Sequence, residues 1–165
     1  MQSEARSRRL DPVAAHPLAE LLACPPSTGS LLTASAQSIE FTPGETIFRQ
    51  SEACLGLYLV VSGQLLRRTE RLETRLTLGT ARPGDLVELA AALGDLHHTY
   101  SLVAQTSGSL LLLPMGELDQ AFQSYPPLRM RLLEELAREV SRAYQVCTLS
   151  NGVRTRRRKS RPQAD

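Results

Sequence analysis

The fold is decided by the run LYLVVSGQLLRR at residues 57–68. Its two β-prone stretches, 57–61 and 65–68, are separated by the turn signal Ser62-Gly63. Comparable short runs and turn signals continue on both sides of it. The other runs are residues 47–49, 75–78, 100–103 and 110–113, and the other turn signals are Pro43-Gly44, Pro83-Gly84 and Ser107-Gly108. This succession is typical of a small antiparallel barrel, which we expect over about residues 38–114.

Helical signals flank the predicted barrel and interrupt it once. Short helices are expected over residues 17–24, 30–37, 90–95 and 116–124, with a break at 25–29. A long helix follows over about residues 126–147, and Pro126-Pro127 suits its start because the N–H that proline lacks has no partner there. The expected fold class is therefore mainly β with flanking helices (α+β). It is an antiparallel β-jelly-roll barrel, or double-stranded β-helix, followed by a long C-terminal dimerisation helix.

The long helix carries an apolar stripe at spacings of three and four residues. The stripe consists of Leu128, Leu132, Leu133, Leu136, Val140, Ala143, Tyr144 and Cys147. A helix of about 20 residues is about 30 Å long, which is more than docking on a small barrel requires. Part of the stripe has the spacing of a two-stranded coiled coil, which predicts a homodimer. The predicted interface is Leu132, Leu133, Leu136, Val140 and Ala143; in the alternative, the whole stripe packs on its own barrel.

The two ends of the chain differ from the middle in composition. Residues 1–17 form an expected N-terminal arm, residues 18–147 the folded domain, and residues 148–165 a basic, disordered tail. Although the formal net charge is only +2, six of the 19 basic side chains stand in this tail. They are Arg154, Arg156, Arg157, Arg158, Lys159 and Arg161. Such a tail predicts salt-sensitive contact with polyanions, and a merely solubilising terminus is the alternative.

The cysteines and the hydropathy pattern bear on location. Cys24, Cys54 and Cys147 are odd in number and far apart, so they match neither a disulfide framework nor the paired spacing of a zinc site. No apolar run approaches the roughly 18 residues of a membrane span. The basic run at residues 6–9 is not followed by the apolar segment of a secretion signal. We therefore expect a cytoplasmic protein with reduced thiols and no membrane span.

Three blocks in series resemble cyclic nucleotide-binding domains of the catabolite activator protein / fumarate-nitrate regulator superfamily. The blocks are FTPGETIFRQ at residues 41–50, LYLVVSG at 57–63 and PGDLV at 83–87. In that family the first block opens the barrel, the second is a core strand before a turn, and the third enters the ligand cassette. The resemblance implies a cyclic nucleotide-binding-like domain at residues 18–147 and, as effector, cyclic AMP or cyclic GMP. It implies no required cofactor.

The cassette, taken here as residues 83–99, departs from the family pattern. The resemblance implies that a glutamate, here Glu88, accepts from the ribose, and that an arginine beside Ser or Thr binds the phosphate. This chain has His98 in place of that arginine, and Val87 stands where a glycine is expected. A histidine is largely neutral at pH 7 and cannot form the bidentate contact. The candidate ligand-binding residues are Val87, Glu88, Leu89, Ala90, His98 and Thr99.

Other functions are less well supported by the residues. Transcription factors of the superfamily continue into a helix-turn-helix, whereas few residues follow 147 here, so we expect no sequence-specific DNA binding by the chain alone. His97 and His98 would point to opposite sides of a strand and could hardly share one metal, and no metal site is expected. The metal-binding histidine pattern of cupin enzymes is absent from the sequence, as is a phosphate-binding loop.

Three hypotheses follow from these observations. The first is a stand-alone regulatory or sensor module that signals through a small ligand or a partner protein and acts as a homodimer. The second is a degenerate, ligand-free module that serves only for dimerisation and interaction. The third, an enzyme built on a jelly-roll barrel, lacks an identifiable pair of nucleophile and base, and we expect no enzymatic activity.

Overall fold

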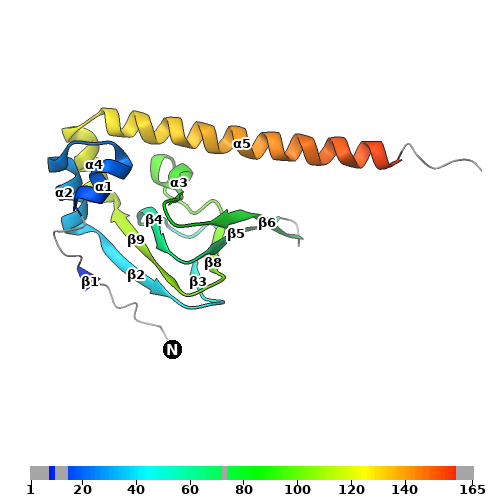
Figure 1. Ribbon diagram of the computed structural model, residues 1–165, viewed down its shortest axis with the longest axis horizontal. Coiled ribbons are helices and arrows are strands. Elements are labelled where there is room, and N and C mark those ends of the chain that lie inside the picture. The colour runs from blue at the N-terminus through cyan, green and yellow to red at the C-terminus, as the bar shows by residue number, and fades with distance from the viewer. Residues whose placement is uncertain (1–7, 10–14, 72–73, 159–165) are drawn as a thin grey trace, which may run out of the picture.

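The computed structural model describes residues 8–9, 15–71 and 74–158 and shows two antiparallel sheets with helices at one end (Figure 1). The first sheet has the strand order β1-β2-β9-β4-β7. Its strands are β1 (Arg8–Arg9), β2 (Gln37–Phe41), β4 (Gly56–Ser62), β7 (Leu86–Val87) and β9 (Gly108–Pro114). The second sheet has the order β3-β8-β5-β6. Its strands are β3 (Thr46–Phe48), β5 (Leu65–Arg71), β6 (Thr74–Ala81) and β8 (Ser101–Ala104).

The predicted fold class is confirmed, although the strands do not close into a barrel. Every strand pair is antiparallel, and consecutive strands such as β2 and β3 belong to different sheets. This is the double-sheet form of a jelly roll. The described strands therefore remain in two separate hydrogen-bonded ladders, which side chains between the sheets hold together.

Strand β4 explains why residues 57–61 read as an unbroken apolar run. Leu57 and Leu59 belong to a core cluster shared with the helices, while Tyr58 and Val60 belong to a second cluster between the sheets. Successive strand residues point to opposite faces, so both faces of β4 are covered from Leu57 to Val60, whereas Val61 is exposed. At its start, a Cβ added to Gly56 would overlap the backbone of the neighbouring strand β9. The strand thus forms the wall between the two cores.

The short helices cover one end of the five-stranded sheet. They are α1 (Ala15–Leu22), α2 (Pro26–Ser35), α3 (Leu89–Leu93) and α4 (Met115–Ser124). The expected break at residues 25–29 is wrong in part, because α2 begins at Pro26 and not at residue 30. Proline is tolerated in the first helical turn, so the pair at residues 25–26 ends α1 and also starts α2. In Figure 1, α1, α2 and α4 gather at one end, and α3 lies below the long helix α5.

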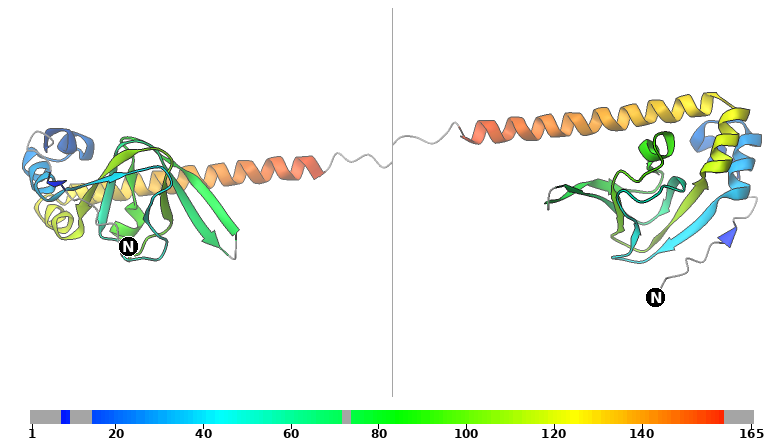
Figure 2. Two further views of the ribbon diagram at one scale, coloured as in Figure 1. Left: turned by 90° about the horizontal axis from the view of Figure 1, so that it is seen from below. Right: turned by 180° about the vertical axis from the view of Figure 1, so that it is seen from behind.

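Helix α5 (Pro127–Arg158) is longer than expected. It continues through the segment from residue 148 to Arg158, for which the sequence predicted disorder. The segment contains no proline, and its arginines are good helix formers, although Gly152 is unfavourable in a helix. Residues 159–165, the rest of the expected disordered tail, lie outside the described part of the chain. Figures 1 and 2 show the second half of α5 running clear of the two sheets.

Among the described residues, no helix is both long and apolar enough to cross a bilayer.

Candidate functional site

Glu88 occupies an unusual backbone position between β7 and α3. Its φ of 71° and ψ of 34° lie in the left-handed region, where a side chain costs roughly 1–2 kcal/mol. Although it precedes the first residue of α3, its side chain does not cap that helix. The side chain instead turns inward and is only 2% exposed. Such a conformation persists only where surrounding contacts determine it.

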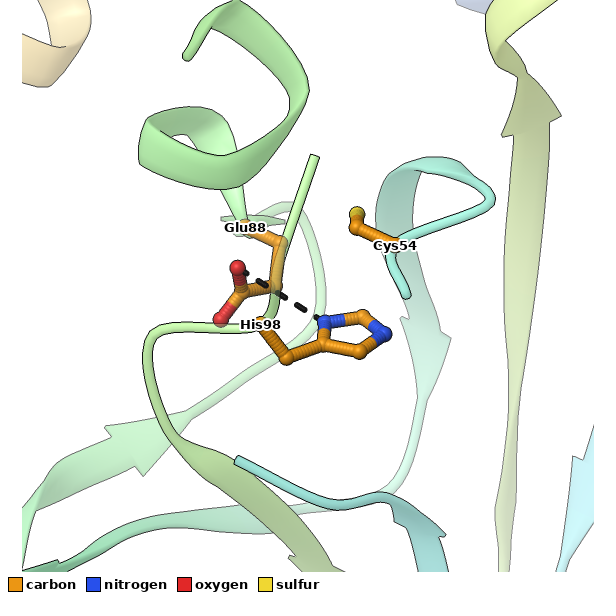
Figure 3. Close-up of side chains that lie close together, drawn as sticks. All are labelled: Cys54, Glu88 and His98. Atoms are coloured by element: carbon orange, nitrogen blue, oxygen red, sulfur yellow. Dashed lines mark ion pairs between the residues drawn. The ribbon is translucent and has the colours of Figure 1, made fainter. Parts of the chain in front are cut away.

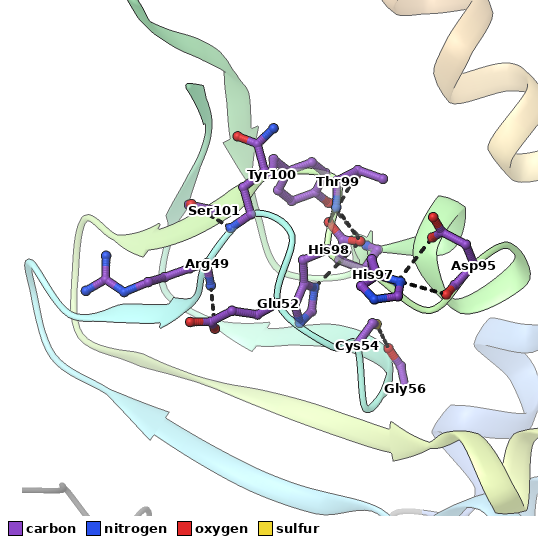
Figure 4. A network of polar contacts seen from close by, with 12 residues as sticks. Arg49, Glu52, Cys54, Gly56, Asp95, His97, His98, Thr99, Tyr100 and Ser101 are labelled. Atoms are coloured by element: carbon purple, nitrogen blue, oxygen red, sulfur yellow. Dashed lines mark hydrogen bonds and ion pairs between the residues drawn. The ribbon is translucent and has the colours of Figure 1, made fainter. Parts of the chain in front are cut away.

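Those contacts come mainly from Thr99. Its hydroxyl donates to Oε1 of Glu88 at 3.1 Å, and its backbone N–H lies 3.3 Å from each carboxylate oxygen. The backbone N–H of Glu88 in turn donates to the hydroxyl of Tyr100 at 3.1 Å. Figure 4 shows these contacts in the wider polar network. The hydrogen bonds of Glu88 are therefore made within the protein.

His98 lies buried beside this carboxylate. Its ring is stacked on Phe48, with the centroids 3.7 Å apart and the planes 4° from parallel. Its Nδ1 is 3.7 Å from Oε2 of Glu88 and has no hydrogen-bond partner. Burial lowers the pKa of the imidazole below its usual value of 6.5, so the ring is neutral at pH 7. It supplies no positive charge for a phosphate.

Cys54 completes the buried cluster, which we call the Cys-Glu-His cluster: Cys54, Glu88 and His98 (Figure 3). Its thiol donates to the carbonyl of Gly56 at 3.1 Å. One ligand-type atom from each of the three side chains lies within 4.8 Å of the other two. The sequence analysis did not select Cys54, because it stands far from the cassette along the chain and no local motif marks it.

Burial governs the protonation of the cluster and its surroundings. Desolvation raises the pKa of Glu88 to about 7, and the hydrogen bonds from Thr99 only partly oppose it. Desolvation also raises the pKa of the Cys54 thiol and of the Tyr58 and Tyr100 hydroxyls. The site is consequently close to neutral in charge near pH 7, and we expect it to favour a ligand other than a free anion.

The remaining predicted site residues lie elsewhere. Val87 and Leu89 are buried in the two core clusters, so they position Glu88 without facing a ligand. Ala90 is exposed. His97 is exposed too, and its backbone N–H donates to Asp95 at 3.1 Å. Of the six candidates, the structure brings together only Glu88, His98 and Thr99.

A polar connection that the sequence analysis missed leads from the cluster to α5. The guanidinium of Arg67 on β5 lies 5.9 Å from the ring centroid of Tyr100 and pairs with Glu139 of α5 at 3.6 Å. Desolvation raises the pKa of Glu139, and Arg67 opposes the shift. Strand alternation could have indicated Arg67, because it shares a strand face with the fully buried Leu65.

The predicted dimer interface divides into two parts. Leu132 is 4% exposed and belongs to the chain's own core, so its assignment to a subunit interface is wrong. Leu136 packs in part against the same core. Val140 is 60% exposed, and Ala143 is exposed as well. The first turns of α5 thus dock on the domain, which was the alternative for the whole stripe, whereas Val140 and Ala143 remain exposed.

The basic residues proposed for polyanion contact fall in two places. Arg154, Arg156, Arg157 and Arg158 belong to the last turns of α5, whose side chains are not described. Lys159 and Arg161 lie outside the described residues.

A family model for the cyclic nucleotide-binding domain matches residues 38–125, which is more than half of the 165-residue chain. The chain belongs to the cyclic nucleotide-binding domain family. The resemblance inferred from the three sequence blocks is thereby confirmed. The match spans the strands of both sheets from β2 onward, together with the cassette and α4. No curated protein sequence matches the chain.

Solved structures of this family share the fold. The catabolite activator protein of Thermus thermophilus is 26% identical, with a TM-score of 0.67 over 77% of this chain and 60% of that one. The sensor domain of the transcriptional regulator DNR from Pseudomonas aeruginosa is 21% identical, with a TM-score of 0.66 over 81% and 89%. The regulatory domain of Toxoplasma gondii PKA, solved with cAMP, is 13% identical, with a TM-score of 0.65 over 76% and 51%. At such identities the last two likenesses show the fold alone.

The buried carboxylate predicts a pH-dependent difference between the wild type and Glu88→Gln. A pKa raised from 4.5 to about 7 on folding means that the folded state keeps a proton that the unfolded state releases. The contribution of Glu88 to stability is therefore complete below pH 4.5 and is lost as pH rises toward 7. Glutamine does not titrate and has no such loss. The free energy of unfolding of the variant should therefore rise relative to that of the wild type by up to about 3 kcal/mol across this pH range.

Urea unfolding at several pH values between 4.5 and 8 measures this difference. The lowered pKa of His98 acts with the opposite sign, but it is present in both proteins and largely cancels in the comparison. A difference in the free energy of unfolding that stays constant with pH would show that Glu88 is ionised in the fold.

Proposed function

We propose that this protein is a regulatory sensor module whose cassette responds to a small effector and signals through α5 within a homodimer. The observation that carries the proposal is the position of Arg67, which contacts Tyr100 of the cassette region and pairs with Glu139 of α5. The match to the cyclic nucleotide-binding domain family supports a regulatory role. A role without enzymatic activity, in the cytoplasm, is part of the proposal.

The polar connection gives the signal a physical route in three steps. A change at the Glu88 carboxylate alters its bonds to Thr99 and, through its backbone N–H, the contact with Tyr100. Tyr100 presents its ring to Arg67, whose side chain is only 16% exposed. Because Arg67 is held on the other side by Glu139, its displacement moves a charge that contacts α5. The Glu88 end of this connection is buried, where polar contacts are strong, whereas Glu139 at the other end is 37% exposed.

The proposed dimer interface, here called the α5 seam, consists of Leu133, Leu136, Val140 and Ala143. The spacings of three and four residues suit packing against a second copy of the same helix. On another face, Glu135 pairs with Arg138 at 3.0 Å and with Arg142 at 3.2 Å, which suits exposure to water. An apolar residue as exposed as Val140, in a helix that leaves its own domain, therefore favours a partner helix.

Ordinary binding of cyclic AMP or cyclic GMP is disfavoured by the cassette. A neutral His98 stacked on Phe48 stands where the family resemblance calls for a phosphate-binding arginine. Loss of a charged bidentate contact is worth about 1.5–3 kcal/mol, or about ten- to a hundredfold in affinity. The Glu88 carboxylate already accepts hydrogen bonds from Thr99 and needs no ligand to do so. This favours the second candidate, a ligand-free dimerisation module.

Two further interactions belong to the proposal. The basic residues from Arg154 to Arg161 would hold polyanions by charge alone, in a manner that weakens as salt rises. The proposal includes no sequence-specific DNA recognition by the described residues. A regulatory partner protein would instead bind according to the position of α5.

The coupling is tested by hydrogen exchange of the amides of α5 around Glu139. Glu88→Gln, which removes the carboxylate charge without changing its size, should alter this exchange in the wild-type background. In an Arg67→Met background the same substitution should have no effect on α5, because the connection is cut. Arg68→Met is the matched control, since Arg68 neighbours Arg67 on β5 without contacting Glu139 in the described structure. Equal responses in all three backgrounds would exclude Arg67 as the connection.

Dimerisation is tested by sedimentation velocity on the wild type and Val140→Glu. A charge in a coiled-coil seam costs several kcal/mol unless paired, so the variant should be a folded monomer at concentrations where the wild type is a dimer. Ser141→Glu, an exposed substitution on a different face of α5, should remain dimeric. If the wild type is monomeric at about ten micromolar, the α5 seam is not a dimer interface and the proposed homodimer is refuted.

The absence of a phosphate-binding cation is tested by calorimetric titration with cyclic AMP and cyclic GMP. The wild type should bind weakly, and His98→Arg should bind about tenfold more tightly or better, because it restores a charge-assisted contact. His97→Arg adds the same charge at an exposed neighbouring position and should have no effect. Tight binding by the wild type would mean that another cation serves the phosphate.

A further inference from the structure

The Cys-Glu-His cluster joins three buried side chains of the kinds that bind transition metals. A thiol, a carboxylate and an imidazole each offer one atom within 4.8 Å of the other two. In Figure 3 the three side chains converge from separate segments, below α3. Cys54, Glu88 and His98 are 5%, 2% and 3% exposed. The set is of mixed chemistry, which distinguishes it from a surface cluster of acidic residues.

A second observation is independent of this proximity. The Nδ1 atom of His98 is buried, faces Oε2 of Glu88 at 3.7 Å, and has no hydrogen-bond partner. A buried polar atom left without a partner is unfavourable by about 1–3 kcal/mol, and such an atom calls for an explanation. The ring is held in its plane by stacking on Phe48 and is only 3% exposed, so little of it meets water. A bound cation would satisfy the nitrogen.

The backbone around the cluster is already held in place. The N–H of Cys54 donates to the carbonyl of Leu96 at 2.7 Å, and the N–H of His98 donates to the carbonyl of Glu52 at 2.9 Å. These two bonds fasten the loop before β4 to the loop after α3. Two of the three side chains are therefore presented together before any ligand arrives.

The carboxylate is divided between two tasks. Its Oε1 accepts from the hydroxyl of Thr99, whereas Oε2 shares only the Thr99 N–H with Oε1 and is the oxygen paired with His98. Hydrogen bonds to a ligating group orient it and commonly change metal affinity by about 10–100-fold. Thr99 can thus hold the carboxylate while its other oxygen meets a metal.

The spacing suits a tetrahedral ion with small adjustments. Bond lengths of about 2.0–2.3 Å to a tetrahedral zinc ion place neighbouring ligand atoms about 3.3–3.6 Å apart. The separation of 3.7 Å between Nδ1 and Oε2 is close to this value, and the other pairs of ligand atoms, at 4.8 Å or less, need to approach by at most about 1.5 Å. Three protein ligands leave a fourth position open for water or another small molecule.

We propose that Cys54, Glu88 and His98 form a binding site for a divalent transition-metal ion of the zinc class. The thiol of Cys54 would release its proton to solvent and give up its bond to the carbonyl of Gly56, so that the thiolate becomes a ligand. The inference rests on the proposed sensor function and names the class of effector that its cassette takes. The ligands come from distant parts of the sequence, which is why cysteine and histidine spacing did not reveal them.

Metal binding would act directly on the connection to α5. Glu88 provides both the proposed ligand oxygen and, through its backbone, the contact with Tyr100. If a metal drew the carboxylate toward Cys54 and His98, the position of Glu88 would change. The hydrogen bond from Glu88 to Tyr100, and with it the contact of Tyr100 with Arg67, would then change as well.

The site is tested with Co²⁺, whose bond to a thiolate gives a charge-transfer absorption that oxygen and nitrogen ligands lack. The full chain, stripped with a chelator, should bind one Co²⁺ per chain and show this band, and Zn²⁺ should abolish it by competition. Cys54→Ser should remove the band, and His98→Gln or Glu88→Gln should weaken binding by about tenfold or more. Cys24→Ser and His97→Gln, which change a thiol and an imidazole outside the cluster, should match the wild type.

A second measurement avoids reliance on buried substitutions that might prevent folding. In the wild-type chain, Zn²⁺ should protect Cys54 from alkylation, as read by mass spectrometry on the peptide that contains it, while Cys24 stays equally reactive. The proposal is overturned if no thiolate band forms, if the band survives Cys54→Ser, or if Zn²⁺ does not protect Cys54.

The outcome is separable from that of the proposed function. Sedimentation of the chelated wild type reports dimerisation through α5 without any metal. A dimer whose α5 responds to Glu88→Gln but whose cluster binds no Co²⁺ would refute the metal site alone. A monomer that binds Co²⁺ at the cluster would refute the proposed homodimeric signalling and leave the site standing.

Discussion

The hydrogen bonds between Thr99 and the buried carboxylate of Glu88 are the contacts on which the organisation of the cassette depends. Without them a carboxyl group would be buried beneath α3 with no partner, which costs several kcal/mol. They also hold Glu88 in its left-handed backbone conformation and so set where α3 begins. The same contacts join the start of α3 to the segment that leads into β8. A site whose polar groups are engaged in this way is preorganised, and an effector must compete with bonds that already exist.

The family of this chain suggests a cyclic nucleotide as ligand, whereas the chemistry of its cassette does not suit a phosphate. The chain has the strands, turns and cassette position of the cyclic nucleotide-binding domain family. Its cassette, however, presents a neutral imidazole and a protonatable acid where a phosphate would need fixed positive charge. A fold of this kind does not fix the ligand of its site, so the function proposed for this chain depends on the side chains of the cassette.

The elements that the sequence predicted well are those whose signal is local. Residues 57–60 are buried on both faces of β4, although Val61 is exposed, and the turns at Gly44 and Gly63 need a positive φ, so both the strand and its turns could be predicted. The extension of α5 to Arg158 was not predicted, because a basic composition was taken as evidence of disorder although arginine favours helices. The identity of Glu88, His98 and Thr99 as neighbours came from the family pattern. Cys54 could not be found in this way, since only the folded chain brings it to His98.

The projection of α5 beyond the sheets has a mechanical consequence. From Glu139, where Arg67 holds the helix, to its last residue Arg158 the rise of about 1.5 Å per residue gives an arm of nearly 30 Å. A tilt of about 10° at the Arg67 contact would sweep the far end through about 5 Å, which is close to one helical turn. Under the proposed function the helix would act as a lever, which converts a small adjustment around one buried carboxylate into a displacement large enough for another macromolecule to detect.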